Sequence, residues 1–266
     1  MSYVASIHIY PVKSLDGIAV SQATILASGA LEGDRSLAIC DEAGELLNTK
    51  RNSGLQFLRL SFDIKKRIAG LTIQDTEQEI FFHVDRERPG IEYWLSNYFG
   101  FPVKLIENLL TGFPEDTAAP GPSIISTETI AEVASWFPRV CVNEMRHRLR
   151  ANIEIGDVPA FWEDQLFSQA DEIVRFKIGT VIFEGINPGQ PCLLSTNYAA
   201  KETYPNLKNI LRAKQKEIMP DLVKRGHFNH FSRLIVKTRV PPQAAEKIVH
   251  IGDEVQILGV SKSLSI

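Results

Sequence analysis

One cysteine stands in a setting that differs from that of the other two. Cys192 lies in NPGQPCLLSTN (187–197), after a Gly/Pro-rich turn and before two leucines and three small polar residues. A lone cysteine is most often a small buried hydrophobic residue. Irregular backbone after a strand, however, is a common location for functional groups, and a thiolate there suits nucleophilic sulfur chemistry or a soft metal. The residues alone leave three interpretations open: an inert core side chain, a nucleophile or a metal ligand.

Basic residues form the second group that could carry chemistry. They are Lys13 in YPVKSL, Arg35 in GDRS, Lys50 and Arg51 in NTKRN, and Arg146, His147, Arg148 and Arg150 in RHRLRANI. Most Lys and Arg side chains are solvated surface charges. If folding gathers them, Arg grips a phosphate or carboxylate through two hydrogen bonds and Lys adds a point charge. Because the net charge of the chain is -3, such a pocket favours a small anion over nucleic acid.

Other common chemistries lack support in the sequence. His227 and His230 in GHFNHF have no neighbouring carboxylate or cysteine, so they do not form a metal motif. There is no G-x-S-x-G, no Walker-type loop and no G-x-G-x-x-G. Cys40 and Cys141, both expected to be inert, are too far from each other and from Cys192 for a disulfide framework or zinc knuckle.

The composition indicates an ordinary globular protein. The chain has 266 residues, of which 44% are hydrophobic and 23% are charged. Three scattered cysteines suit a reducing compartment. The opening MSYVASIHIYPVKSL carries His8 and Lys13 within its apolar part, so it is neither a signal peptide nor a membrane span. We expect a cytoplasmic protein.

The elements that must position these residues are mostly strands in the first hundred residues. Strands are predicted within 3–10, 18–26, 55–64, 71–75 and 79–84, from β-branched residues and partial alternation. Residues 35–51 are predicted to form two strands joined by a hairpin turn at 41–44, where Asp and Gly supply the turn geometry. A short helix is predicted over 91–100, closed by Gly100. Strands at this spacing favour a barrel or a sandwich.

A loop over 108–123, rich in Pro and Gly, separates this region from the rest of the chain. Helical spacing follows after hydroxyl caps in STETIAEVASWF (126–137), and CVNEMRHRL (141–149) is predicted to continue helically. The amphipathic segment 206–219 predicts another helix. Strands are predicted within 151–155, 180–186, 231–238 and 247–258. The fold class is therefore α+β, mostly β, with a β-barrel-like region at 1–107 and a second β-barrel domain with peripheral helices at 108–266. The N-terminal strands are candidates to complete this second barrel.

Six segments in this order resemble the MOSC superfamily, whose name comes from the C-terminal domain of molybdenum-cofactor sulfurases. They are YVASIHIYPVKSLDGI, LEGDRSLAICDEAGELLNTKR, RLRANIEI, FWEDQL, PCLLSTN and HIGDEVQIL. The chain is most similar to the two-part members, with an N-terminal MOSC β-barrel region before the MOSC domain, such as the mitochondrial amidoxime-reducing component and its bacterial relatives. The segment RLRANIEI has Ala151 where the family has proline.

The resemblance implies a molybdenum cofactor, molybdopterin, and a reductase for N-hydroxylated substrates such as amidoximes and N-oxides. It assigns the metal-ligand and catalytic role to Cys192. It assigns the pterin-phosphate contacts to Lys13, Lys50, Arg51 and Arg150, and further polar contacts to Asn152, Ser195, Thr196 and Asn197. Pyridoxal phosphate binding is a further label that the family carries.

The chain has no Cys-rich iron–sulfur segment and no dinucleotide motif, so a separate electron-transfer partner of the reductase, ferredoxin or cytochrome type is expected. Two departures from the reductase-like members are present: Asn197 and Tyr198 replace a Val and an Asp, and Ala119-Pro120 replaces an Asp-Ser pair. A sulfur carrier using a Cys192 persulfide and a non-catalytic cofactor-delivery protein therefore remain the alternatives.

Overall fold

The computed structural model describes residues 1–49, 51–168, 172–189 and 234–262, together with Ile210, Ala213, Lys214 and Glu217. In the first part of the chain the elements are β1 (Tyr3–Ile9), β2 (Ile18–Val20), β3 (Gln22–Thr24), β4 (Leu37–Asp41), η1 (Ser53–Phe57), β5 (Leu58–Asp63), β6 (Ile68–Ile73), β7 (Glu79–His83), α1 (Arg88–Phe99) and β8 (Val103–Glu107). In the second part they are β9 (Ile124–Ser126), α2 (Thr127–Ser135), α3 (Val142–Leu149), β10 (Ile153–Gly156), η2 (Trp162–Leu166), β11 (Glu172–Ile178), β12 (Val181–Gly189), β13 (Ile235–Arg239), η3 (Pro242–Ala244), β14 (Ile248–His250) and β15 (Val255–Lys262). The predicted α+β class with a predominance of strands is confirmed.

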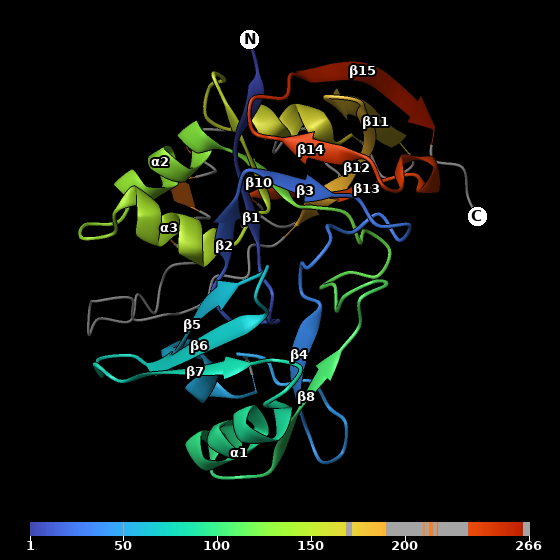
Figure 1. The fold of residues 1–266 in the computed structure, drawn as a ribbon. Coiled ribbons are helices and arrows are strands. Elements are labelled where there is room, and N and C mark those ends of the chain that lie inside the picture. The colour runs from blue at the N-terminus through green and yellow to red at the C-terminus, as the bar shows by residue number, and fades with distance from the viewer. Residues whose placement is uncertain are drawn as a thin grey trace.

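An eight-stranded sheet joins the two parts of the chain. Its strand order is β15-β11-β12-β13-β9-β10-β1-β2, so strands from the beginning of the chain lie beside strands from its second half (Figure 1). A bridge between Tyr3 and Glu254 also connects β1 to the residues just before β15, at the other edge of the sheet. The sheet therefore curls around one apolar core, in which Ile7, Phe176 and Phe183 have no exposed surface.

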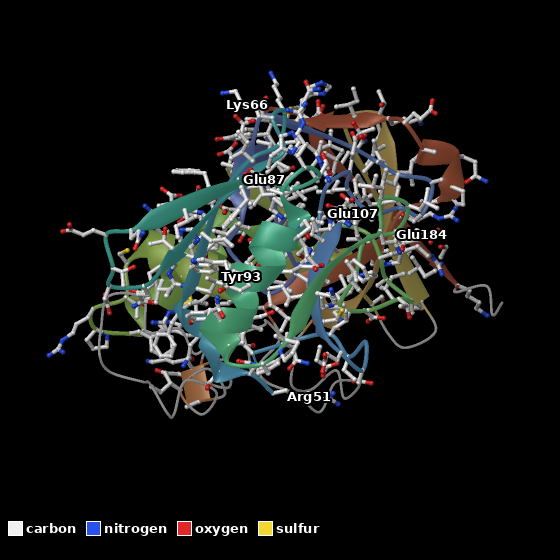
Figure 2. The ribbon with its side chains drawn as sticks, turned by 60° about the horizontal axis from the view of Figure 1, so that its bottom comes forward. Arg51, Lys66, Glu87, Tyr93, Glu107 and Glu184 are labelled. Atoms are coloured by element: carbon white, nitrogen blue, oxygen red, sulfur yellow. The ribbon has the colours of Figure 1, made fainter. Side chains whose placement is uncertain are left out.

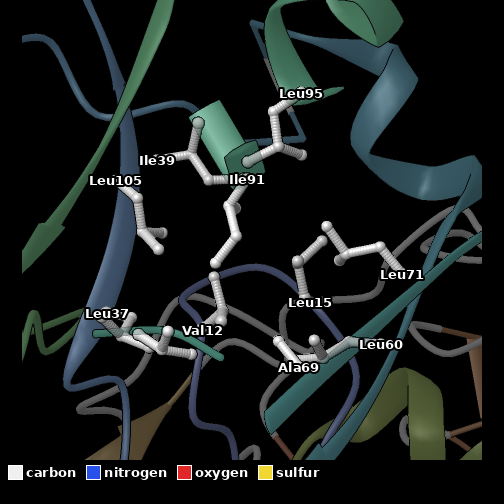
Figure 3. A pocket seen from close by; sticks show the side chains of 11 residues that line it. Val12, Leu15, Leu37, Ile39, Leu60, Ala69, Leu71, Ile91, Leu95 and Leu105 are labelled. Carbon is white, nitrogen blue, oxygen red and sulfur yellow. The ribbon is translucent and has the colours of Figure 1, made fainter. Parts of the chain in front are cut away.

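A separate lobe holds residues 37–107. The pair β4 and β8 and the meander β5-β6-β7 enclose an apolar core with α1, in the lower half of Figure 1. Figure 3 shows a small apolar cavity in this core, with Val12 and Leu15 facing side chains from both sheets and from α1. These two residues belong to the turn after β1, which carries Lys13. The lobe core therefore fixes the segment that presents Lys13.

Helices α2 and α3 cover a third apolar core beside the large sheet. The Oγ atom of Ser126 caps α2 by accepting a hydrogen bond from the N–H of Thr129 at 3.1 Å. Helix α3 ends at Arg150, whose φ of 55° places it in the left-handed region. Strand β10 starts only three residues later, so α3 and β10 hold Arg150 and Asn152 between them.

Two predictions about local structure differ from the structure. Residues 45–49 do not form the second strand of a hairpin; β4 pairs instead with β8, and only a bridge joins Cys40 to Leu46. The turn itself is present, because the Gly44 N–H donates to the Asp41 carbonyl at 3.0 Å. Cys141 is exposed and precedes α3, whereas Cys40 is buried as predicted.

Some predictions fall on residues that the structure does not describe. The helix predicted over 206–219 has four described residues, which are helical, and Ile210 packs against the core beneath α2 and α3. His227 and His230 lie outside the described residues. In the described part of the chain, no helix combines the length and apolar character needed to cross a bilayer. The predicted domain boundary at residue 107 stays a prediction. Two strands before it pair with strands after it: β1 with β10 and β3 with β14.

Candidate functional site

Tyr10 is the centre of a cluster that joins three distant parts of the chain. The Arg150 guanidinium carbon lies 4.1 Å from the centroid of the Tyr10 ring, and that of Arg35 lies 5.2 Å from it. Both distances are within the range of cation–π contact. Tyr10 directly follows β1, Arg35 lies shortly before β4 and Arg150 ends α3, so the fold brings three distant parts of the chain together here. We call Tyr10, Lys13, Arg35 and Arg150 the Tyr10 cluster.

Arg150 is a predicted site residue that the structure buries, with 5% of its surface exposed. Its Nη1 donates to the Leu15 carbonyl, and its backbone N–H closes α3 by donating to the Arg146 carbonyl at 3.0 Å. A left-handed conformation is costly for a residue with a side chain, and glycine is the usual choice at a helix end. Arg150 nevertheless occupies this position, and its guanidinium lies over the Tyr10 ring.

Arg35 was not among the predicted site residues. Its guanidinium pairs with Asp34, lies over Tyr10 and reaches the Oδ1 atom of Asn152 at 3.5 Å. Burial lowers the pKa of Arg35, but the charge of Asp34, with smaller effects from Tyr10 and Glu115, outweighs burial and raises it. Arg35 therefore stays charged. The GDRS segment was the signal that could have assigned it, since it lies in one of the six matched segments.

The Tyr10 side chain is neutral and acts as a donor. Burial raises the pKa of Tyr10 to about 12, although the neighbouring arginines lower it in part. The hydroxyl donates to the Ala151 carbonyl at 3.1 Å, and the Tyr10 N–H donates to the Asp34 carboxylate at 2.8 Å. These bonds fix the ring, and through it the spacing of the two guanidinium groups.

Lys13 stands in the turn after β1, where its N–H donates to the Leu37 carbonyl at 2.7 Å. Its side chain is 11% exposed. The Nζ atom donates to the carbonyls of Phe113 at 2.8 Å and Pro114 at 3.3 Å, and lies 3.6 Å from a Glu115 carboxylate oxygen. Because Phe113 N–H donates to the Arg35 carbonyl at 2.9 Å, Lys13 lies on the Arg35 side of the cluster.

Asn152, another predicted site residue, is 2% exposed and bonded within the protein. Its Oδ1 accepts from both the N–H and the hydroxyl of Ser123 at 3.1 Å, and its Nδ2 donates to the His8 carbonyl at 3.1 Å. The side chain thus ties β1, β10 and the end of the 108–123 loop together. Its observed role is to hold the backbone beside Arg150.

The structure does not bring Arg51 to the Tyr10 cluster. Its side chain is 71% exposed and pairs with Glu45 at 2.8 Å. Figure 2 shows it at the rim of the molecule. The predicted residues Lys50, Cys192, Ser195, Thr196 and Asn197 lie outside the described residues. Strand β12, which leads to Cys192, pairs with β13 up to its last residue, Gly189.

Two carboxyl side chains in η2 form a second feature with possible chemical activity. The sequence analysis assigned no catalytic or binding role to either of them. Glu163 is 2% exposed, and within the described part of the chain neither of its side-chain oxygens has a hydrogen-bond partner. Burial raises the pKa of Glu163 to about 8 and that of Asp164 to about 7. Both belong to FWEDQL, one of the six matched segments. In the described ranges no three His, Cys, Asp or Glu side chains form a potential metal site.

Comparison with known proteins finds a similarity in the N-terminal part of the chain. Residues 1–102 match the family model of the MOSC N-terminal beta barrel domain. No curated protein matches the sequence significantly. The crystal structure of the YUAD protein from Bacillus subtilis is similar over 99% of this chain and 98% of its own, with 13% identity and a TM-score of 0.39.

Proposed function

We propose that this protein is a molybdenum-cofactor-binding oxidoreductase that reduces N-hydroxylated compounds. MOSC domains are associated with molybdenum-cofactor sulfurase-like and cofactor-binding proteins. The single observation that carries the proposal is the Tyr10 cluster, in which Arg35 and Arg150 contact one buried ring and Lys13 lies beside them. Such a gathering of cations in a net-acidic chain favours one small anionic ligand.

The donors of the cluster fit the phosphate end of a pterin cofactor. Two guanidinium groups and an ammonium would supply charge-assisted hydrogen bonds to the phosphate, each contributing about 1.5–3 kcal/mol. Ser123 and Asn152 brace the backbone between them, so the donors are held before a ligand arrives. Lys50 is a further proposed phosphate contact. Ser195, Thr196 and Asn197 are proposed to supply polar contacts elsewhere in the pocket.

Cys192 is proposed as the protein thiolate for the metal, because molybdenum takes soft sulfur ligands. The bound cofactor would supply a two-electron reduction in which the N–O bond of the substrate breaks and its oxygen leaves as water with two protons. The residues of the Tyr10 cluster would bind and orient the cofactor rather than react. The electrons are proposed to come from a separate redox protein, since the sequence carries no motif for an electron-transfer group of its own.

Turnover tests this proposal directly. The full chain, produced in a host that makes the cofactor, is incubated with a reduced dye and benzamidoxime. We expect amidine formation that Cys192→Ser abolishes and Arg51→Met, a change at an exposed cation, leaves intact. A persulfide carrier would contain no retained molybdenum, and a delivery protein would retain the pterin without turnover. Unchanged activity in Cys192→Ser would show that the cysteine assignment is wrong.

A further inference from the structure

The loop after β8 lies on the Tyr10 cluster and carries a carboxylate to it. We call residues 112–116 of this loop the strap. At its first end, Phe113 N–H donates to the Arg35 carbonyl at 2.9 Å. At its last end, Asp116 accepts from Lys237 of β13 at 2.9 Å. Glu115 lies between these two anchors, so the strap holds it beside Lys13.

Gly112 allows the strap to approach the cluster closely. Its φ of +62° is a conformation that other residues rarely adopt, and a Cβ atom there would lie 2.6 Å from the Asp34 carbonyl oxygen. Asp34 is the partner of Arg35 and of the Tyr10 N–H. The strap therefore begins in contact with the backbone that positions one of the cluster's cations.

Glu115 serves as a counter-ion for the cluster. Its carboxylate lies 3.6 Å from the Lys13 ammonium, and its charge also acts on Arg35. About half of its side chain is exposed, at 53%, whereas that of Lys13 is 11% exposed. The carboxylate is thus the solvent-facing partner of a mostly buried cation, and it can leave without opening a core.

We infer that Glu115 is an internal competitor for the anion site, which an incoming phosphate must displace from Lys13. This inference rests on the proposed function, because it assumes that Lys13 contacts the anionic end of the ligand. A dianionic phosphate gains more from Lys13 and Arg35 than one carboxylate does, whereas a monocarboxylate such as acetate only exchanges like for like. Glu115 therefore lowers the affinity of the site for every anion, and a dianion overcomes this competition more easily than acetate does.

Phosphate binding to the full chain without cofactor tests the inference. Inorganic phosphate, and separately acetate, are titrated into wild-type protein by isothermal titration calorimetry at physiological ionic strength. The ion pair is partly solvated, so we expect Glu115→Gln to bind phosphate about two- to fivefold more tightly. Acetate must displace the same carboxylate, so we expect its affinity to rise by a similar factor and the ratio of phosphate affinity to acetate affinity to stay nearly unchanged. Asp116→Asn is the matched control, since it makes the same charge change one residue away on a side chain that pairs with Lys237.

The outcomes separate the inference from the proposed function. Loss of phosphate binding in Lys13→Met, with no gain in Glu115→Gln, would overturn the inference and leave the anion site in place. An equal gain in Asp116→Asn would also overturn it, because a general change in charge would then explain the effect. No phosphate binding by any variant would overturn both the inference and the anion site on which it rests. Molybdenum retention is measured independently, so its result does not decide the role of Glu115.

Discussion

Glu163 is a buried acid whose environment acts against its charged form. Within the described residues its side-chain oxygens have no hydrogen-bond partner, and burial raises its pKa to about 8. The Glu163 backbone N–H and the nearby hydroxyls of Thr129 and Ser126 favour the charged form and lower this pKa in part, while the charge of Asp164 raises it. At neutral pH the Glu163 side chain is therefore mostly protonated. The folded protein holds a proton here that the unfolded chain releases above its ordinary pKa.

This protonation links stability to pH with a definite sign. Because the folded pKa of Glu163 is above the unfolded one, its contribution is fully present below pH 4.5 and is lost as pH rises to about 8. Between these values the free energy of unfolding falls by up to about 1.4 kcal/mol per pH unit at this site. Glu163→Gln removes the titrating group, so we expect the free energy of unfolding of the variant, relative to that of wild type, to increase as pH rises from 5 to 8. Urea unfolding at several pH values measures this change.

Glu128→Gln is the matched control for that experiment, because Glu128 is exposed in the first turn of α2. We expect a pH profile parallel to that of wild type. If Glu163→Gln also followed the wild-type profile, the Glu163 carboxyl would not be protonated in the folded state. Asp164 acts in the same direction, since burial raises its pKa to about 7, and it would leave part of the slope in place.

At the scale of elements, glycines at two chain reversals differ in what surrounds them. Gly100 ends α1 with a φ of +77°, and nothing lies within 4 Å of a Cβ atom built there. Gly112 has a φ of +62°, and its Cβ would meet the backbone oxygens of Asp34 at 2.6 Å and Arg35 at 3.1 Å. Gly100 is needed only for its left-handed backbone conformation. Gly112 is needed for its conformation and also because a side chain there would collide with the neighbouring segment.

Alanine substitution should separate the cost of the left-handed conformation from the cost of a steric clash. We expect Gly100→Ala to cost about 1 kcal/mol, which is the conformational cost alone. Gly112→Ala should cost about 2–4 kcal/mol, since the backbone contact adds to the conformational strain. The clash falls on the backbone of Asp34 and Arg35, so displacement of Arg35 should also weaken phosphate binding. Thermal unfolding and the phosphate titration provide both readouts. Equal costs for the two variants would contradict the close packing of the strap.

Local sequence patterns predicted the positions of helices and strands better than they predicted which strands pair. The Ser126 cap and the Gly100 helix end were readable because each depends on neighbouring residues in the chain. The prediction of a second strand in the 35–51 hairpin was wrong. Strand β4 pairs instead with β8, more than sixty residues away, and no local sequence signal specifies this pairing. Strands β8 and β11 were not predicted.

The site shows the same division between local and distant information. Lys13 and Arg150 came from a resemblance in ordered segments, and the structure places both at the Tyr10 cluster. Arg35 was counted only as a cation, because nothing in GDRS shows that its side chain would stack on Tyr10. The burial of Glu163 could not be read from FWEDQL, since charged residues are usually exposed. Contacts of this kind arise only from the fold.

At the scale of the whole molecule, the chain is interleaved across its predicted boundary. Strand β1 lies between β10 and β2 in the large sheet, and β3 pairs with β14. The main core combines residues from 4–31 with residues from 124–255. A fragment spanning 108–266 would expose the edge of β10 that pairs with β1, together with the part of the core that β1 fills.

We therefore expect fragments 1–107 and 108–266 to lack cooperative unfolding when each is produced alone. Co-expression should restore part of the native fold, because β1 could then pair with β10. Circular dichroism during thermal unfolding, with size-exclusion chromatography of the co-expressed pair, measures this. If each fragment unfolded cooperatively on its own, the two parts would be independent domains with a boundary at residue 107.

The central claim is that distant cations and Cys192 serve one cofactor. Its most direct test is molybdenum content with pterin detection, on protein purified from a host that makes the cofactor. We predict that the wild-type protein retains both, that Cys192→Ser loses the metal, that Arg150→Met loses both, and that the exposed-site control Arg51→Met keeps both. Wild-type protein without molybdenum or pterin, or a Cys192→Ser variant with wild-type metal content, would contradict the account.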